Sequence, residues 1–184
     1  MLRRFASASS VRILAVLFGS LTCLSCSGVF AKDDGRAFGD DLGRFRIAAA
    51  LDSTTCGANA LGAPEDWEFE VVLSRDASRL FWNTNATAIE GTVDDNGRFS
   101  LVAENVINTG NGQNAKLSCT IVRKDTATGT FDDPKTARAF DGSLEYSFAP
   151  HGTADCSEAM AENGLLTLPC SMSYRLDAAW VSSR

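Results

Sequence analysis

The sequence predicts an all-β fold, an antiparallel meander of eight or nine strands that forms a small closed or partly open barrel. Large apolar residues alternate with polar ones through most of the chain after residue 43, as the opposite-facing side chains of half-buried strands require. Short turn signals separate these runs, so consecutive strands must be antiparallel. Gly91, Gly129 and Gly142 fall within strand runs, where glycine often marks a bulge or bend. This favours a barrel over the alternative, a two-sheet β-sandwich.

Five longer runs carry the alternation. Their apolar, inward-facing residues are, in chain order, Phe45, Ile47, Ala49 and Leu51; Trp67, Phe69, Val71 and Leu73; Leu117, Cys119 and Ile121; Phe140, Leu144, Tyr146 and Phe148; and Cys170, Met172, Tyr174 and Leu176.

Shorter strands are predicted around residues 80–82, 89–93 and 98–101. The last two are joined by Asn96-Gly97, a pair that favours a tight hairpin turn. Phe81 is out of phase with Leu80 and Trp82, so we expect one face of that strand to be partly exposed. Lys124-Asp125 is predicted to turn the chain between two strands.

One short helical turn is expected near residues 157–163, with Ser157 as the N-cap and Gly164 near its C-terminus. The segment from Asn105 to Ala115 is rich in Asn and Gly and lacks a periodic apolar face. It is predicted to form a mobile loop.

Residues 1–31 have the features of a secretory signal peptide. A positively charged start precedes a short apolar stretch from Val11 to Cys26, which is shorter and more polar than a membrane-spanning helix. Cleavage after Ala31 is one interpretation. The other is lipidation at Cys26, since Cys23-Leu24-Ser25-Cys26 resembles a bacterial lipobox. Residues 32–43 are then a flexible linker and residues 44–184 a single β domain, which is secreted, periplasmic or anchored to a membrane by lipid.

Charge excludes one class of partner. Of the 17 basic residues in the chain three lie in residues 1–31, so 14 basic residues face 23 acidic ones after export and the net charge is −9. Such a domain repels phosphate backbones and anionic lipid, and we therefore expect no nucleic-acid partner.

Four cysteines follow the signal segment: Cys56, Cys119, Cys156 and Cys170. In an oxidising compartment this even number predicts two disulfides, and the absence of a CxxC pair argues against a zinc site. Three pairings are open. Closeness in sequence favours Cys156 with Cys170, which leaves Cys56 with Cys119.

No catalytic constellation is evident, and neither a metal nor a cofactor is expected. His151, the only histidine, lies in a loop after a strand and is predicted to be exposed. Asp94-Asp95-Asn96-Gly97 has oxygen ligands suited to calcium but lacks the spacing of an EF-hand loop, and turn formation already explains it. Glu68, Glu70 and Glu90 alternate onto the wet face, away from any apolar cleft.

Aromatic residues offer the main candidates for a binding site. They mostly occupy the inward phase, where they either fill a small barrel or line a cavity for an apolar ligand. The candidate binding residues are Trp67, Trp82, Phe99, Tyr146 and Tyr174.

The opening strand also carries a family resemblance. Gly43-Arg44-Phe45, followed by an antiparallel meander and a late disulfide, resembles the lipocalin-type barrels, which typically show Gly-x-Trp at this point. Phe45 stands here in place of the tryptophan. The resemblance covers three residues and an architecture, so it implies neither a ligand nor an activity.

These observations lead us to expect a non-enzymatic binding or interaction module of the cell envelope or exterior. Its partner is expected to be a protein or a small apolar ligand, with membrane association only if Cys26 is lipidated; the oligomeric state is left open. A carboxylate-dependent hydrolase using His151 is one alternative. A secreted inhibitor that wedges a loop into an enzyme's cleft is another.

Overall fold

Eight strands and two short helical segments make up the described part of the domain. The structure is a computed structural model that describes residues 39–58, 60–83, 88–108, 119–152 and 155–183. Its strands are β1 (Asp40–Thr54), β2 (Asp66–Asp76), β3 (Arg79–Asn83), β4 (Ala88–Val93), β5 (Arg98–Asn108), β6 (Thr120–Phe131), β7 (Ala139–Pro150) and β8 (Cys170–Ser182). The helical segments are η1 (Ala60–Gly62), a 3-10 turn, and α1 (Ser157–Glu162). The predicted signal segment and Cys26 lie outside the described residues.

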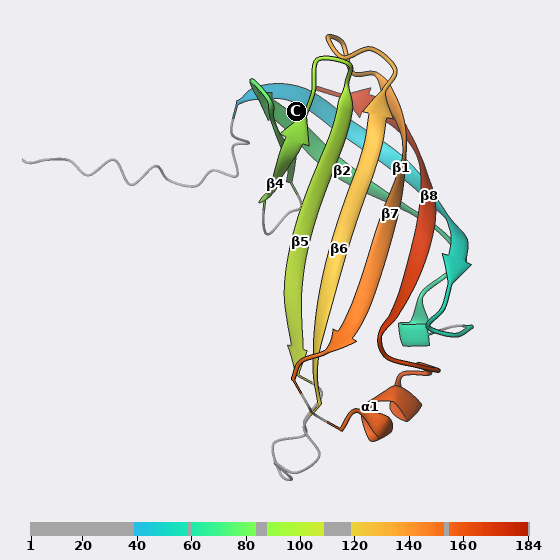
Figure 1. Ribbon diagram of the computed structural model, residues 1–184. Helices are drawn as coiled ribbons and strands as arrows, with labels where there is room; N and C mark the ends of the chain where they lie inside the picture. The colour runs from blue at the N-terminus through green and yellow to red at the C-terminus, as the bar shows by residue number, and fades with distance from the viewer. Residues whose placement is uncertain (1–38, 59, 84–87, 109–118, 153–154, 184) are drawn as a thin grey trace, which may run out of the picture. The chain divides into compact units, whose positions relative to one another are not determined.

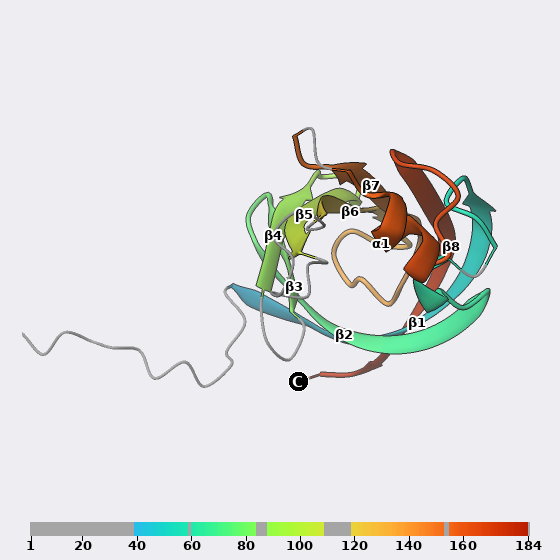
Figure 2. The same cartoon turned by 90° about the horizontal axis from the view of Figure 1, so that it is seen from below.

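The strands form a closed barrel in simple sequence order, with every neighbouring pair antiparallel. β8 closes the barrel against β1, where Ile47 lies opposite Ala178. Figure 1 shows the long strands β5 to β8 side by side, and Figure 2 shows the barrel along its axis. The predicted all-β meander is confirmed, and the barrel rather than the sandwich is the architecture.

The inward phase of the strands builds the core, as the alternation predicts. Phe45 and Ile47 are 0% exposed and share one face of β1 with the buried Ala49. The same holds along β8, where the buried residues alternate with half-buried or exposed ones as far as Ala178. Burying an aliphatic or aromatic side chain of this size contributes about 1.5–3 kcal/mol, so this face supplies most of the driving force for closure.

One end of the barrel is filled by phenylalanines from four strands. Phe140 packs edge-on against Phe99, with ring centroids 5.2 Å apart, and also contacts Phe131 at 5.7 Å and Phe45 at 5.8 Å. A Cβ at Gly129 would lie 2.5 Å from Cζ of Phe99, so the absence of a side chain there lets the ring approach the β6 backbone. This phenylalanine cluster forms a solid floor to the barrel interior.

The opposite end carries both disulfides. Cys56, just after β1, is bonded to Cys170 at the start of β8, and Cys119, just before β6, is bonded to Cys156 before α1. The favoured pairing of Cys156 with Cys170 is therefore wrong. β1 and β8 are neighbours only because the barrel closes, and that closure brings together two cysteines separated by 114 residues. Two disulfides indicate an oxidising, extracytoplasmic compartment.

The predicted turn at Lys124-Asp125 is also wrong, because β6 continues through both residues. The residues from Asn105 to Asn108, assigned to a loop, are the last part of β5; the rest of that predicted loop lies outside the described residues. β1 begins at Asp40, within the segment that the sequence assigns to the linker.

The expectation of a partly exposed face on β3 is wrong. Phe81 is only 4% exposed although it is out of phase with its buried neighbours Leu80 and Trp82, so β3 is buried on both sides. α1 lies where predicted, and Gly164 follows it with φ 66°. Ser157 is not the N-cap: that position is Cys156, and Ser157 instead donates from N and Oγ to Asp155.

Candidate ligand cavity in the barrel

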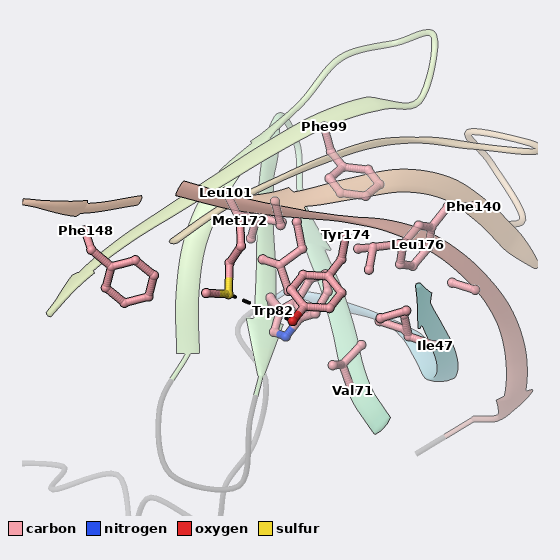
Figure 3. Packing of buried hydrophobic residues seen from close by; sticks show 14 of the residues in the cluster. Ile47, Val71, Trp82, Phe99, Leu101, Phe140, Phe148, Met172, Tyr174 and Leu176 are labelled. Carbon is pink, nitrogen blue, oxygen red and sulfur yellow. Dashed lines mark hydrogen bonds between the residues drawn. The ribbon is translucent and has the colours of Figure 1, made fainter. Parts of the chain in front are cut away.

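A cavity of about 290 Å³ lies inside the barrel. Inward-facing residues of six consecutive strands line most of it: Trp67, Phe69 and Val71 of β2, Trp82 of β3, Ile89 of β4, Leu101 and Ala103 of β5, Arg123, Asp125 and Ala127 of β6, and Leu144 and Tyr146 of β7, with Glu70 of β2 at its edge. Figure 3 shows Val71, Trp82 and Leu101 directed toward the same interior.

Aromatic rings form one wall of the cavity. Trp67 and Phe69 stack with their ring centroids 4.4 Å apart and their planes 20° from parallel. Phe69 in turn lies 6.2 Å from Trp82. These spacings are those of favourable aromatic pairs, so the wall is a packed and preformed surface.

Of the five predicted binding residues, the structure places Trp67, Trp82 and Tyr146 on the cavity surface. Tyr174 lies behind them: it is 1% exposed, its hydroxyl donates to the Pro64 carbonyl oxygen at 3.1 Å, and its ring packs against Trp67 and Tyr146. Phe99 belongs to the floor. The two residues outside the lining therefore support the site without facing a ligand.

The other wall contains an ion pair that the sequence analysis missed. Arg123 donates from Nε to Oδ1 of Asp125 at 2.6 Å and from Nη2 to Oδ2 at 2.5 Å. Both side chains occupy inward positions of β6, in phase with the buried Ile121 and Ala127. Carrying the alternation of Cys119 and Ile121 on by two and by four residues would have found Arg123 and Asp125. The pattern was missed because Lys124-Asp125 was interpreted as a turn.

Electrostatics ties Tyr146 to this pair. The guanidinium carbon of Arg123 lies 4.7 Å from the centroid of the Tyr146 ring, a cation–π distance. Burial raises the pKa of Tyr146 to about 12, so its hydroxyl is neutral over the physiological range. The hydrogen bond to Asp125 raises the pKa of Arg123 above its ordinary value, so the guanidinium stays charged. The cavity thus contains a permanent cation, its counter-ion and a neutral phenol.

The barrel wall is uneven beside the cavity. β4 pairs with β5 over only three residue pairs, from Gly91 with Leu101 to Val93 with Phe99, whereas β5 pairs with β6 along its whole length. β3 likewise pairs with β2 only from Val72 onward. In Figure 1 the short β4 lies beside the upper part of the much longer β5. The Arg123 side chain, which lines the cavity, is 36% exposed, so the cavity is open to solvent.

The remaining candidates for chemistry lie away from the cavity. His151 is exposed, as predicted, and its backbone N–H donates to Thr120. Oδ1 of Asp94 accepts hydrogen bonds from the backbone of Asn96 and Arg98, which fixes the β4–β5 hairpin. Backbone hydrogen bonds lower the pKa values of Asp132 and Asp133 in the β6–β7 turn. Within the described residues no three His, Cys, Asp or Glu side chains gather in a way that would hold a metal ion.

The described geometry defines a class, an eight-stranded antiparallel meander barrel with an aromatic cavity and a solid floor. Comparison with protein-family models, with curated proteins and with solved structures finds no match for this chain. No helix in the described ranges has the length and apolar character needed to cross a membrane.

Proposed function

We propose that this domain is a non-enzymatic binding protein that holds a small, mainly apolar, ring-containing ligand inside the barrel. The main support for the proposal is the preformed cavity of about 290 Å³, with Trp67 stacked on Phe69 and Trp82 tilted beside Phe69 along one wall. Binding pockets for small molecules are typically concave, mostly apolar and supplied with a few polar groups. The Arg123–Asp125 pair supplies the polar groups here.

Cavity volume limits the size of the ligand. An apolar cavity of about 150 Å³ accommodates a benzene molecule, so about twice that volume suits two fused rings or one ring with a short substituent. Rings also suit the stacked wall, because an aromatic face gains more from an aromatic partner than from a flexible chain. We therefore take naphthalene-sized molecules as the probes of choice.

The hydrolase alternative has less support from the geometry. It requires carboxylates that converge with each other or with His151. Of the two acidic residues at the cavity, Asp125 has both oxygens bonded to Arg123, and Glu70 accepts hydrogen bonds from Arg44 and Arg46 on the outer surface. Neither is placed as a free general base among the described residues.

The experiment is a titration of the purified mature protein with naphthalene and with 2-acetylnaphthalene. Two of the three tryptophans, Trp67 and Trp82, line the cavity, so saturable quenching of tryptophan fluorescence with one site per chain is expected. Isothermal calorimetry checks the stoichiometry. Absence of saturation for both compounds up to their solubility limits overturns the proposal.

Export is part of the same proposal. We infer that the domain works outside the cytoplasm, either free after cleavage following Ala31 or tethered through a lipid on Cys26. Two disulfides and the signal-like N-terminal sequence support this inference. Intact mass spectrometry of the exported protein separates the two forms, since the lipidated chain begins at Cys26 and carries the mass of its acyl groups.

A further inference from the structure

We propose that the cavity selects neutral ligands that carry a hydrogen-bond acceptor, such as an aryl ketone or ether, over ligands that carry a carboxylate. The inference rests on the proposed function and names the ligand class for the same cavity. It is drawn from the polar groups of the cavity wall, their remaining hydrogen-bonding capacity and their net charge.

Arg123 has hydrogen-bonding capacity to spare. A guanidinium group offers five N–H donors, and Asp125 accepts two of them, one from Nε and one from Nη2. In the described part of the chain, no group accepts a hydrogen bond from the other three N–H donors of Arg123. A ligand oxygen close to Nη1 or Nη2 would accept from a charged donor, which gives a stronger bond than a neutral donor does.

The wall contains a second donor. The hydroxyl of Tyr146, kept protonated by a pKa of about 12, can donate as well. The cavity therefore offers donors, whereas both of its carboxylates are already engaged, Asp125 by Arg123 and Glu70 by Arg44 and Arg46.

Charge explains why a carboxylate is disfavoured. The Asp125 side chain is only 15% exposed and holds both oxygens against Arg123, so the positive charge of the guanidinium is already neutralised. A carboxylate ligand would have to lose its hydration, approach Asp125 and share a cation that another carboxylate already binds bidentately. A neutral carbonyl oxygen can accept from the free N–H groups without this repulsion.

Three naphthalene derivatives of similar size test the proposal by calorimetry: 2-acetylnaphthalene, 2-ethylnaphthalene and 2-naphthoate. We expect 2-acetylnaphthalene to bind about tenfold more tightly than 2-ethylnaphthalene, since it adds one hydrogen bond to a charged donor. It should also bind at least about tenfold more tightly than 2-naphthoate at neutral pH. Equal affinity for the ketone and the hydrocarbon, or tighter binding of the carboxylate, overturns the inference.

Asp125→Asn provides a second test, because it removes the counter-ion and leaves Arg123 in place. In this variant the affinity for 2-naphthoate relative to that for 2-acetylnaphthalene should rise about tenfold or more. Asp141→Asn is the matched control, since Asp141 is an exposed residue on the neighbouring strand β7, and it should leave the ratio unchanged. A purely structural role for Asp125 would weaken both probes alike, which also counts against the inference.

The two levels of the proposal can fail separately. If none of the naphthalene compounds binds the wild-type protein, both the proposed function and the proposed ligand class are wrong. If the compounds bind without preference for the ketone, the cavity is a binding site but its selectivity is not set by the Arg123–Asp125 pair.

Discussion

Arg123 and Asp125 lie two residues apart on the inward face of β6 and join through two hydrogen bonds of 2.6 and 2.5 Å inside the barrel. The strand supplies the geometry, since side chains at i and i+2 point to the same face. A bidentate pair in this position satisfies Asp125 while its side chain is mostly buried.

Breaking this pair should cost stability. Arg123→Met retains the aliphatic stem but leaves the Asp125 carboxylate without its partner, and we expect a loss of about 1–2 kcal/mol in the free energy of unfolding. The double change Arg123→Met with Asp125→Val should recover most of that loss, since no uncompensated charge remains. Urea denaturation measures both. Arg44→Met, which removes an exposed partner of Glu70, serves as the control and should change stability by less than about 0.5 kcal/mol.

The two disulfides should differ in their effect on stability. Replacing Cys56 and Cys170 with alanine opens a loop of 114 residues, and replacing Cys119 and Cys156 opens one of 37 residues. The chain-entropy model gives losses of about 5 and about 4 kcal/mol respectively, so the first pair should matter more. Denaturation of the two variants tests the order. Peptide mapping of the unreduced protein tests the pairing directly, and a peptide linking Cys156 to Cys170 would contradict the structure.

The alkaline titration should expose the buried phenols. The chain has two tyrosines, and burial raises the pKa of both, that of Tyr146 to about 12. The absorbance of tyrosinate at alkaline pH should therefore appear later in the folded protein than in the unfolded chain. Tyr146→Phe should remove the part of the absorbance rise that occurs at the highest pH. Two ordinary titrations near pH 10 in the folded protein would count against the described packing.

The same shift has a definite sign for stability. Because the folded protein holds the Tyr146 proton more tightly than the unfolded chain, its contribution is fully present below pH about 10 and is lost as the pH rises to about 12. The expected loss is up to about 2 kcal/mol, since the ring keeps partial contact with solvent through the cavity. Comparing the pH dependence of unfolding for the wild type and Tyr146→Phe isolates this contribution.

Filling the cavity should weaken ligand binding without unfolding the barrel. Ala103 of β5 lines the cavity, and phenylalanine there would occupy part of its volume of about 290 Å³. We expect Ala103→Phe to weaken the binding of 2-acetylnaphthalene by about tenfold or more, with unfolding free energy unchanged within about 1 kcal/mol. Ala149→Phe places the same ring on an exposed position of β7 and should bind like the wild type. Unchanged affinity in Ala103→Phe would place the ligand elsewhere.

The floor of the barrel should be intolerant of a side chain at Gly129. An added Cβ would lie 2.5 Å from Cζ of Phe99 and 2.7 Å from the backbone oxygen of Asp141, so either the ring or the strand must move. We expect Gly129→Ala to lose about 1–3 kcal/mol of stability. Thr130→Ala, at the exposed neighbouring position, should change it by less than about 0.5 kcal/mol. A Gly129→Ala protein as stable as the wild type would show that the Phe99 ring is not confined there.

Most of the barrel was predictable because strand periodicity is a local property. Phe45 and Ile47 alternate with Arg44 and Arg46 along one strand, and no distant part of the chain is needed to see this pattern. The prediction failed where a local signal had two meanings. Lys124-Asp125 has the composition of a turn, but Asp125 is an inward residue satisfied by Arg123, a partner that compositional rules do not consider.

Spacing along the chain was enough to predict the class of fold and the inward residues of most strands, and the even number of cysteines after the signal segment was enough to predict two disulfides. Which cysteines meet depends on the tertiary structure, because the closure of β8 against β1 brings Cys170 to Cys56. The tertiary structure also sets which aromatic residues face a cavity and which support it. Whether an interior is filled or hollow depends on how side chains from six strands meet, and no single strand carries that information.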